Sequence, residues 1–444
     1  MNKPTLILIY PAPDKDRLGS RRRRSTSVPK LNLSLLAAYA DDLFDVRIID
    51  ETVEDIDFDI KADLVAITVL TLVARRAYEI AAEFSKRGAK IVMGGFHGHF
   101  FPDEVAKHAD ALVIGEAEGV WEQLLHDFLA GKMKERYQRD TPHSLVGLRI
   151  PRHDLVKREF YSLPNVMETA RGCPNKCAYC AVTKYWGYRY RFRPVQEVID
   201  EIRSMPPGGI AFVDDNIIGS PSRAKELFTA MIPLKRKWSS QADFKLAKDP
   251  ELLELCAKSG CQWIFMGIES VNAQNLKDVG KSRINKVDEY QESLRTIRDA
   301  GINVLGSFIF GLDHDDKTVF DNTIQFCEDN RLPGANFYIF VPLPATELFD
   351  KMEEEGRILD RDWSHYDGNH VVFQPMLMTP DELLEGYLSA YRSFYSIRSI
   401  LKRNLMPHRG MLQALALNIG RKSNYRYFEE GCRMKWKGNV GLTS

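Results

Sequence analysis

Three cysteines lie within eight residues of one another, in the order Cys173-Pro-Asn-Lys-Cys177-Ala-Tyr-Cys180. Thiolates are soft ligands that hold zinc and iron–sulfur clusters. A structural zinc site needs a fourth Cys or His at short spacing, but His153 lies well upstream and the next cysteine is Cys256. Three thiolates fit a four-iron four-sulfur cluster better, because one iron is then left open to an outside molecule.

The other four cysteines are scattered along the 444 residues, so the chain does not carry a disulfide scaffold. Single cysteines of this kind usually behave as small apolar side chains. We therefore expect core or surface thiols at Cys256, Cys261, Cys327 and Cys432.

The composition is that of a globular protein, with 44% apolar and 27% charged residues. Basic and acidic residues both number 61, which argues against the broad basic field of a nucleic-acid-binding protein. The apolar stretch at 5–10 is far too short for a membrane span, and no signal-peptide pattern precedes it. We expect a cytoplasmic protein that does not bind nucleic acid.

Short apolar runs alternate with helical periodicity in the first part of the chain. The helices are expected at 75–87 and 102–108, with glycine turns just after the strands. This rhythm predicts a doubly wound, Rossmann-like parallel sheet that binds ligands at the carboxyl ends of its strands. The predicted strands are 5–10, 46–49, 64–69, 91–93 and 111–114.

A second series of strands and helices begins after a linker rich in His, Arg and Pro. Six units predict a partial (β/α)6 barrel that stays open, followed by a mainly helical region. The predicted strands are 166–170, 210–214, 242–245, 264–269, 304–310 and 337–341. The expected domains are 1–140 (Rossmann-like), 141–165 (linker), 166–347 (barrel) and 348–444 (helical cap).

Three helices of the second part are marked by their end residues. Asp249 before Pro250 is expected to open a helix that Gly260 closes. Asn285 is expected to open another that Gly301 closes. Thr379 with Pro380 predicts the start of a long helix.

The CxxxCxxC motif, with Tyr179 before its last cysteine and a barrel pattern around it, resembles the radical S-adenosylmethionine superfamily. The resemblance implies that the methionine part of S-adenosylmethionine binds the open iron. It also implies that one electron cleaves the sulfonium to a 5′-deoxyadenosyl radical, which abstracts a substrate hydrogen. The electron would come from an external donor such as flavodoxin or ferredoxin.

The same resemblance places cofactor-binding residues at the ends of the barrel strands. Asp214 or Asp215 would hold the methionine part, and Glu269 and Ser270 would lie near the ribose and the methionine ammonium. A buried carboxylate is costly unless it meets a cation or hydroxyls, which suits Glu269.

Three further residues match this pattern. Tyr179 would lie near the adenine, with packing inside the loop as the alternative interpretation. Ser307 belongs to a glycine-bearing strand that lets the adenine approach the backbone. Phe340 ends the sixth strand at the adenine side, where a plain turn after a core strand is the alternative.

The amino-terminal region resembles the cobalamin-binding domain of class B radical enzymes, in which the corrin lies flat on the strand ends. No DxHxxG motif is present, so no histidine is marked as a lower ligand of cobalt. Members of the class share this absence and hold cobalamin with its own base displaced; a domain that has lost the cofactor is the alternative. His97 and His99 flank Gly98 in a predicted loop, where a solvated histidine is the simpler interpretation. The implied cobalamin residues are Thr68, Leu70, Thr71, Gly94, Gly95, His97, Gly115 and Glu116.

Taken together, these features predict a cobalamin-dependent radical enzyme that methylates an unactivated carbon and uses two S-adenosylmethionine molecules per turnover. The alternative is carbon–carbon bond formation, ring closure or rearrangement without methyl transfer, on a degenerate cobalamin domain. An iron–sulfur electron carrier is a third hypothesis. It is disfavoured because an iron that is open to outside molecules is a disadvantage in an electron carrier.

Two basic segments each allow two interpretations, so they do not identify the substrate. The four arginines at 21–24 are expected in a solvated loop, or at the sheet edge where they would hold an anionic group. A later helix combines aromatic and basic residues: it is expected to pack its aromatic face on the barrel, or else to contact a membrane that presents a lipid-like substrate. These helix residues are Tyr391, Arg392, Phe394, Tyr395, Arg398, Lys402 and Arg403.

Overall fold

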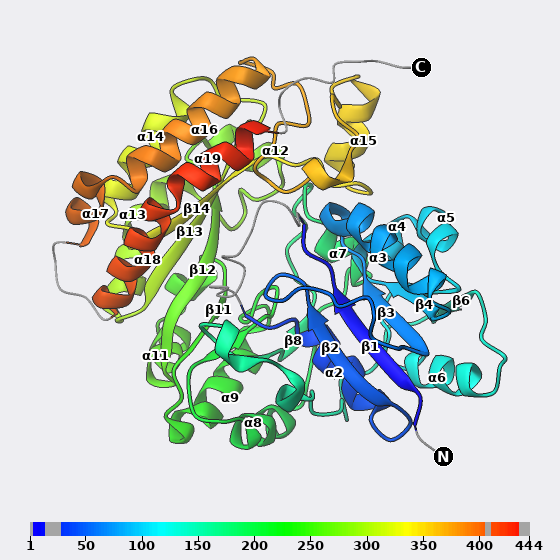
Figure 1. The fold of residues 1–444 in the computed structure, drawn as a ribbon. Helices are drawn as coiled ribbons and strands as arrows, with labels where there is room; N and C mark the ends of the chain where they lie inside the picture. The colour runs from blue at the N-terminus through cyan, green and yellow to red at the C-terminus, as the bar shows by residue number, and fades with distance from the viewer. Residues whose placement is uncertain (1–2, 14–27, 405–409, 435–444) are drawn as a thin grey trace. The chain divides into compact units, whose positions relative to one another are not determined.

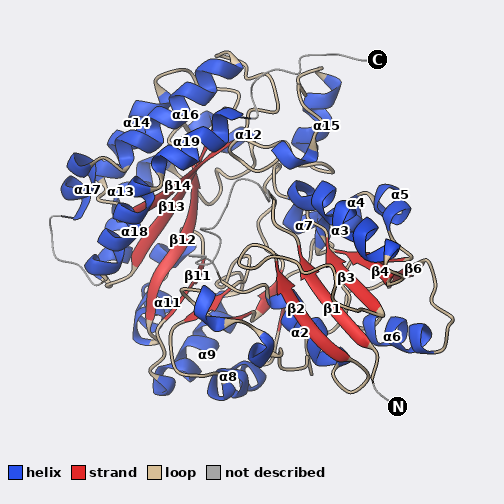
Figure 2. Cartoon of the chain, in the orientation of Figure 1, coloured by secondary structure: helices blue, strands red, loops and turns tan. Residues whose placement is uncertain are grey.

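The computed structural model describes residues 3–13, 28–404 and 410–434, and the chain divides into two compact units (Figure 1). Unit 1 consists of Met1–Arg171 and Tyr185–Val213, and unit 2 of Gly172–Lys184 and Asp214–Ser444. Strands in both units are accompanied by helices, as Figure 2 shows. The arginines at 21–24 lie outside the described residues.

Unit 1 contains the predicted doubly wound sheet, in the order β2-β1-β3-β4-β5-β6 with all neighbours parallel. The five predicted strands are confirmed to within one residue at each end. The sixth, β6, escaped prediction because only one of its three side chains is buried. The strands are β1 (Thr5–Tyr10), β2 (Asp45–Asp50), β3 (Leu64–Thr68), β4 (Lys90–Gly94), β5 (Ala111–Ile114) and β6 (Arg136–Gln138).

Helices cover both faces of this sheet because side chains alternate along each strand. Leu6 and Leu8 of β1 pack in one cluster with α2 (Leu31–Ala40) and α6 (Trp121–Leu129). Ile7 and Ile9 pack in the opposite cluster with α3 (Ala74–Lys86), which confirms the helix predicted at 75–87.

Two predictions in unit 1 need correction. The segment after β4 is the short helix α4 (Phe96–Phe100) and not a loop, so His97 and His99 are helical. The helix predicted at 102–108 is α5 (Pro102–Val105) followed by the 3₁₀ turn η3 (Ala106–His108). The region predicted as a linker contains the 3₁₀ turns η4 (His153–Leu155) and η5 (Arg158–Phe160), and its last residue begins a strand.

Unit 1 also includes the beginning of the second βα series. β7 (Asn165–Met167) and β10 (Ile210–Phe212) pair in parallel, and α8 (Val195–Ser204) lies between them in the sequence. β8 (Ala170–Arg171) and β9 (Arg191–Phe192) form a small antiparallel pair.

Unit 2 carries the rest of the βα series as parallel strands β11 (Trp238–Gln241), β12 (Cys261–Glu269), β13 (Asn303–Phe310) and β14 (Gly334–Ile339). The strand predicted at 242–245 is wrong, since β11 ends at Gln241 and α10 (Lys245–Lys248) follows. The apolar residues that suggested a strand, Ala242 and Phe244, are buried in the connection. The other helices of this series are α7 (Ala181–Tyr185, which ends in unit 1), α9 (Pro221–Met231), α11 (Pro250–Lys258), α12 (Ala273–Asp278), α13 (Tyr290–Asp299) and α14 (Val319–Asp329).

The structure confirms two of the three predicted helix starts. The Asp249 side chain accepts from Leu252 N at the start of α11, and Thr379 forms a capping box with Glu382 at the start of α16 (Pro380–Phe394). Asn285 does not open α13, because the 3₁₀ turn η7 (Val287–Glu289) precedes that helix. Its amide instead donates to Gly267 O and Ile268 O on β12, at 2.8 and 2.9 Å.

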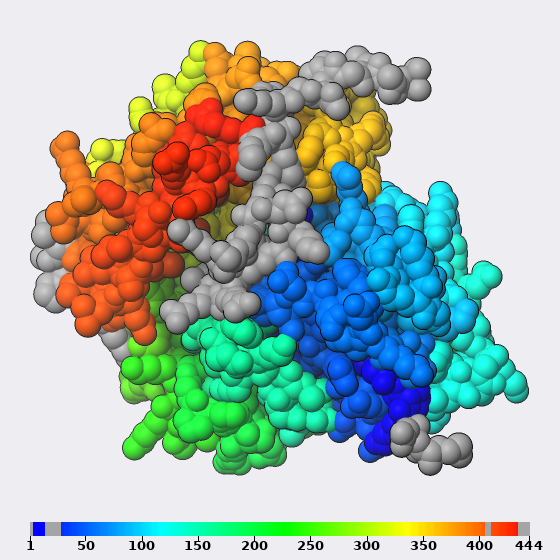
Figure 3. Space-filling view, viewed as in Figure 1, coloured from blue at the N-terminus to red at the C-terminus, as the bar shows by residue number. Residues whose placement is uncertain are grey.

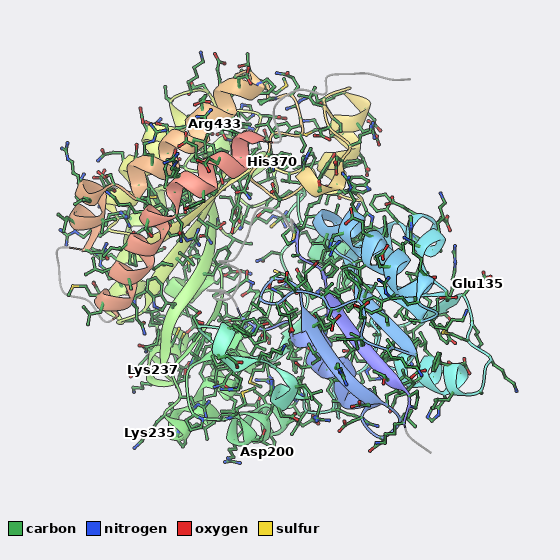
Figure 4. The ribbon with its side chains drawn as sticks, in the orientation of Figure 1. Glu135, Asp200, Lys235, Lys237, His370 and Arg433 are labelled. Carbon is green, nitrogen blue, oxygen red and sulfur yellow. The ribbon has the colours of Figure 1, made fainter. Side chains whose placement is uncertain are left out.

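The carboxy-terminal region is helical, as predicted: α15 (Glu347–Glu354), α16, α17 (Ile397–Asn404), α18 (Met411–Ser423) and α19 (Tyr425–Met434). The two last helices, drawn in red, form part of the surface in Figure 3. Arg433 of α19 donates to Glu385 of α16 at 2.9 Å and so connects these helices (Figure 4). No helix among the described residues is long and apolar enough to cross a bilayer.

The aromatic face of α16 packs on β14, which is the first of the two expected arrangements. Tyr395 OH donates to Ala335 O at 2.6 Å, and the Phe394 and Phe337 rings meet edge to face at 5.2 Å. The guanidinium of Arg403 is buried over the Phe394 ring and donates to Leu332 O at 2.7 Å. The aromatic side chains of this helix are therefore occupied by packing inside unit 2.

Candidate functional site

The three cysteines of the motif lie on the loop that opens unit 2, where each is partly exposed, whereas the four scattered cysteines are buried. Strand-end segments hold this loop at several points. Gly172 N donates to Asp215 Oδ2 at 3.0 Å, and Asn175 Nδ2 donates to Asp243 Oδ2 at 2.9 Å. The loop is thus fixed by carboxylates from two other segments of unit 2.

Glycine is required where the loop meets its neighbours closely. Gly172 has φ +90°, a conformation that side chains disfavour. A Cβ on Gly280, which has φ +72°, would lie 3.0 Å from Lys176 O. Nearby, Ala178 N donates to Val279 O at 3.1 Å. The backbone of the cysteine loop therefore packs directly on the chain that follows α12.

The donor set of the loop suits a cluster. Burial raises the pKa of all three thiols, that of Cys180 to about 12, and a bound metal ion would favour their deprotonation. Within the described ranges, no three His, Cys, Asp or Glu side chains converge on a single metal ion. Three cysteines that each bind a different iron need no such convergence.

A cavity of about 320 Å³ in unit 2 brings together four of the residues predicted to bind S-adenosylmethionine: Tyr179, Glu269, Ser307 and Phe340. The paired residues Ile309 and Tyr338 of β13 and β14 add to its wall. Ser270 and Asp214 are buried and do not line this cavity. Nor does Asp215, whose carboxylate accepts from Gly172 N.

Glu269 reaches the cavity through an unusual backbone. It has φ +65° and follows a register shift at the end of β12. Its Oε1 accepts from Tyr179 OH at 2.9 Å and forms an ion pair with Lys281. Although burial lowers the pKa of Lys281, Glu269 and the nearby thiols raise it more, so the amine stays charged.

Sequence reasoning missed Lys281, which belongs to no motif that we recognised. The only signal was chemical: a carboxylate in a barrel needs a cation or hydroxyls, and the structure supplies both, from Lys281 and Tyr179.

A second cavity, of about 440 Å³, lies in unit 1 at the carboxyl ends of β3, β4 and β5. It is lined by six of the eight predicted cobalamin residues, whereas Thr71 and His97 do not line it. The six are Thr68, Leu70, Gly94, Gly95, Gly115 and Glu116. A Cβ on Gly95, which has φ +115°, would lie 2.9 Å from Val69 O, so only glycine fits this strand end.

No histidine lines this cavity among the residues described by the structure. The His97 ring is buried, with Nδ1 3.4 Å from Thr71 Oγ1 and Nε2 3.2 Å from Glu104 Oε1. Burial lowers the pKa of both His97 and His99. His99 packs edge-on against Tyr185, with ring centroids 5.1 Å apart.

A buried charge network borders the same cavity and was not predicted. Arg171 donates to Glu116 at 3.0 Å and to Glu118 at 2.6 Å, and it also pairs with Glu168. Arg191 donates to Glu116 at 2.7 Å. The Trp186 ring lies 5.3 Å from the Arg171 guanidinium and 5.8 Å from that of Arg191. The aromatic and basic run at 185–193 was the available signal.

The two cavities fit the implied cofactors in different ways. The loop thiols and the carboxylate of Glu269 provide ligands and hydrogen-bond acceptors for a cluster and S-adenosylmethionine. The glycine-bearing floor and apolar walls in unit 1, with Leu70 and Trp186 among them, suit a flat, largely apolar ring such as a corrin.

Comparisons with known proteins agree with this chemistry. Family models match for the radical SAM superfamily at 167–327, the B12 binding domain at 21–125 and a domain of unknown function at 346–428. Bacteriochlorophyllide d C-12(1)-methyltransferase of Chlorobaculum tepidum is 31% identical over 392 residues, 85% of each chain. Bacteriochlorophyllide d C-8(2)-methyltransferase of the same organism is 28% identical and covers 86% of this chain and 88% of that one.

A solved structure shares the fold. It is the radical S-adenosylmethionine methyltransferase TsrM from Kitasatospora setae, with tryptophan substrate and a cofactor analogue bound. It matches with a TM-score of 0.68 at 15% identity, over 98% of this chain and 99% of that one. The cluster loop, the two cavities and these relatives lead to one assignment: the chain belongs to the cobalamin-dependent radical S-adenosylmethionine methyltransferases, enzymes that use a four-iron four-sulfur cluster, S-adenosylmethionine and cobalamin.

Proposed function

We propose that the enzyme methylates an unactivated carbon of a small-molecule or lipid-like substrate by a radical route. The supporting observation is that one chain combines a three-thiolate loop beside a carboxylate-bearing cavity with an apolar, glycine-floored cavity in its cobalamin-binding domain. The two relatives reported above match this chain over most of their length, and both are methyltransferases. This similarity favours methyl transfer over the alternative of ring closure or rearrangement.

When bound, the cluster with S-adenosylmethionine supplies the 5′-deoxyadenosyl radical, and methylcobalamin supplies the methyl group. One C–H bond of the substrate is broken and one C–CH₃ bond is formed. Per turnover, two S-adenosylmethionine molecules and two electrons give the methylated product, 5′-deoxyadenosine, methionine and S-adenosylhomocysteine. Flavodoxin or ferredoxin would deliver the electrons, in the cytoplasm.

Residues of unit 2 would bind the cluster and S-adenosylmethionine, and residues of unit 1 would bind cobalamin. Cys173, Cys177 and Cys180 would hold the cluster. Glu269 would accept a hydrogen bond from a ligand hydroxyl or ammonium, while Tyr179, Ser307 and Phe340 would shape the S-adenosylmethionine cavity. In unit 1, the six cavity residues named above would contact the corrin. The division into 1–140, 141–165, 166–347 and 348–444 remains a prediction.

The product first shows whether a methyl group is transferred to carbon. A strain that lacks the gene is complemented, grown with trideuteromethyl methionine, and compared with the uncomplemented strain by mass spectrometry. The complemented strain should contain a product that carries three deuterium atoms on a carbon-bound methyl group. The polarity of the product also shows whether the substrate is a lipid.

The stoichiometry then tests the mechanism in purified, reconstituted enzyme with the identified substrate. Product, 5′-deoxyadenosine and S-adenosylhomocysteine should form in equal amounts. S-adenosylhomocysteine without 5′-deoxyadenosine would indicate polar methyl transfer, and 5′-deoxyadenosine without S-adenosylhomocysteine would indicate radical chemistry without methylation.

A further inference from the structure

A buried three-residue cluster joins the cysteine loop to the end of β12. Lys281 and Glu269 form an ion pair in which each side chain is at most 10% exposed. Lys281 Nζ also donates to Gly267 O at 3.0 Å and lies 3.4 Å from Tyr179 OH. Since Tyr179 stands between Cys177 and Cys180 in the sequence, this cluster attaches the carboxylate directly to the loop.

The two oxygens of Glu269 have different surroundings. Both Tyr179 OH and Lys281 Nζ bond to Oε1, and Oε2 bonds to no described residue. Glu269 lines the S-adenosylmethionine cavity, whereas Lys281 does not. Lys281 Nζ therefore bonds to Oε1 without lining the cavity itself, and Oε2 is left for a ligand.

The backbone next to the Lys281–Glu269 ion pair leaves space for these two side chains. A Cβ on Gly267 would lie 2.6 Å from Lys281 Nζ and 2.2 Å from Glu269 Oε1, so glycine leaves the space that the pair occupies. The carbonyl groups at the end of β12 are satisfied by side chains, because Asn285 donates to both Gly267 O and Ile268 O. The segment after α12 thus determines where the Glu269 carboxylate points.

We propose that Lys281 is a positioning residue for S-adenosylmethionine: it holds Glu269 Oε1 so that Oε2 faces the cavity as a hydrogen-bond acceptor. This inference rests on the proposed binding of S-adenosylmethionine at Glu269. Removal of Lys281 leaves a buried carboxylate without its cation, so the carboxylate is no longer held in the orientation that presents Oε2 to the ligand.

Equilibrium binding of S-adenosylmethionine tests the inference without turnover. Reconstituted protein is dialysed against labelled S-adenosylmethionine in the absence of reductant, and the iron content of each variant is measured. Lys281→Gln and Glu269→Gln should each weaken binding about tenfold to a hundredfold, the range for one hydrogen bond to a charged group. Lys281→Arg should recover part of the affinity, and Lys286→Gln, at an exposed lysine that pairs with Glu289, should bind as the wild type does.

The double variant shows whether Lys281 acts through Glu269. If it does, Glu269→Gln with Lys281→Gln binds no more weakly than Glu269→Gln alone, because the second change has nothing left to position. This comparison also holds if Lys281→Gln alone fails to fold, since the neutral pair leaves no unpaired charge. Gly267→Ala should reproduce the loss by displacing the pair.

The outcomes separate the two ideas. Full affinity of Glu269→Gln would overturn the proposed binding at Glu269. Weak binding of Glu269→Gln with full affinity of Lys281→Gln would overturn only the positioning role. Additive losses in the double variant would also overturn it, because Lys281 would then contact the ligand itself.

Discussion

Arg171 is the most informative residue to change in unit 1, because its guanidinium bonds to three carboxylates while only 6% of the side chain is exposed. Removal of one partner from a buried ion pair costs about 3–5 kcal/mol. Arg191 would still pair with Glu116, so we take the lower end for Arg171→Met. In a unit of about 200 residues, about 3 kcal/mol lowers the midpoint of thermal unfolding by about 6–12 °C.

The pH dependence identifies the cause of the loss. Burial raises the pKa of Glu118, but Arg171 lowers it more, and the net pKa lies below the usual value. A lowered pKa in the folded state stabilises the wild type above the ordinary range of a glutamate, and this stabilisation is lost as the pH falls through the lowered value. Without Arg171, burial still raises the pKa of Glu118 and only the lesser effects of a backbone hydrogen bond and of His143 lower it, so this pKa should rise and acid should protonate the carboxylate.

Differential scanning calorimetry at pH 7.5 and pH 5.5 checks both effects. The midpoint difference between Arg171→Met and wild type should be smaller at pH 5.5 than at pH 7.5. The control is Arg136→Met, which removes a pair with Asp103 that is largely exposed and should change stability by less than about 1 kcal/mol. A midpoint loss that is equal at the two pH values would refute the electrostatic reasoning and point to lost packing.

Three further predictions concern the cofactors. Anaerobic reconstitution should give about four irons and four sulfides per chain with absorbance near 400 nm, and replacement of the three loop cysteines by Ala should abolish both; stoichiometric zinc without iron would contradict the cluster. The cobalt(II) form of the cobalamin-loaded protein should show no nitrogen superhyperfine splitting in electron paramagnetic resonance, because no described histidine lines the unit 1 cavity and the cofactor's own base is expected to be displaced from cobalt; such splitting would contradict this prediction and make His97 and His99 the first residues to replace. Gly95→Val should reduce retained cobalamin severalfold with unchanged iron content, since its side chain would collide with Val69 O; retention equal to wild type would remove this strand end from the corrin site.

Much of the fold could be predicted from the sequence because its signals are local. Strands buried on both faces appear as continuous apolar runs, as at Thr5–Tyr10, and cap residues such as Asp249 and Thr379 mark helix starts within one turn. Prediction failed where the local pattern was weak. β11 has the sequence Trp-Ser-Ser-Gln, and the apolar residues that follow it are buried outside the strand.

The sequence by itself indicated the cluster chemistry, because eight residues are few enough for a single loop to bring three thiolates together. It also indicated that Glu269 needs a partner, but not which one. Only the tertiary structure decided that Lys281 fills this role, and that the guanidinium groups of Arg171 and Arg191 both lie over the Trp186 ring beside the unit 1 cavity. Such pairings join residues from different parts of the fold, and their strength depends on burial that several elements create together, which no local pattern records.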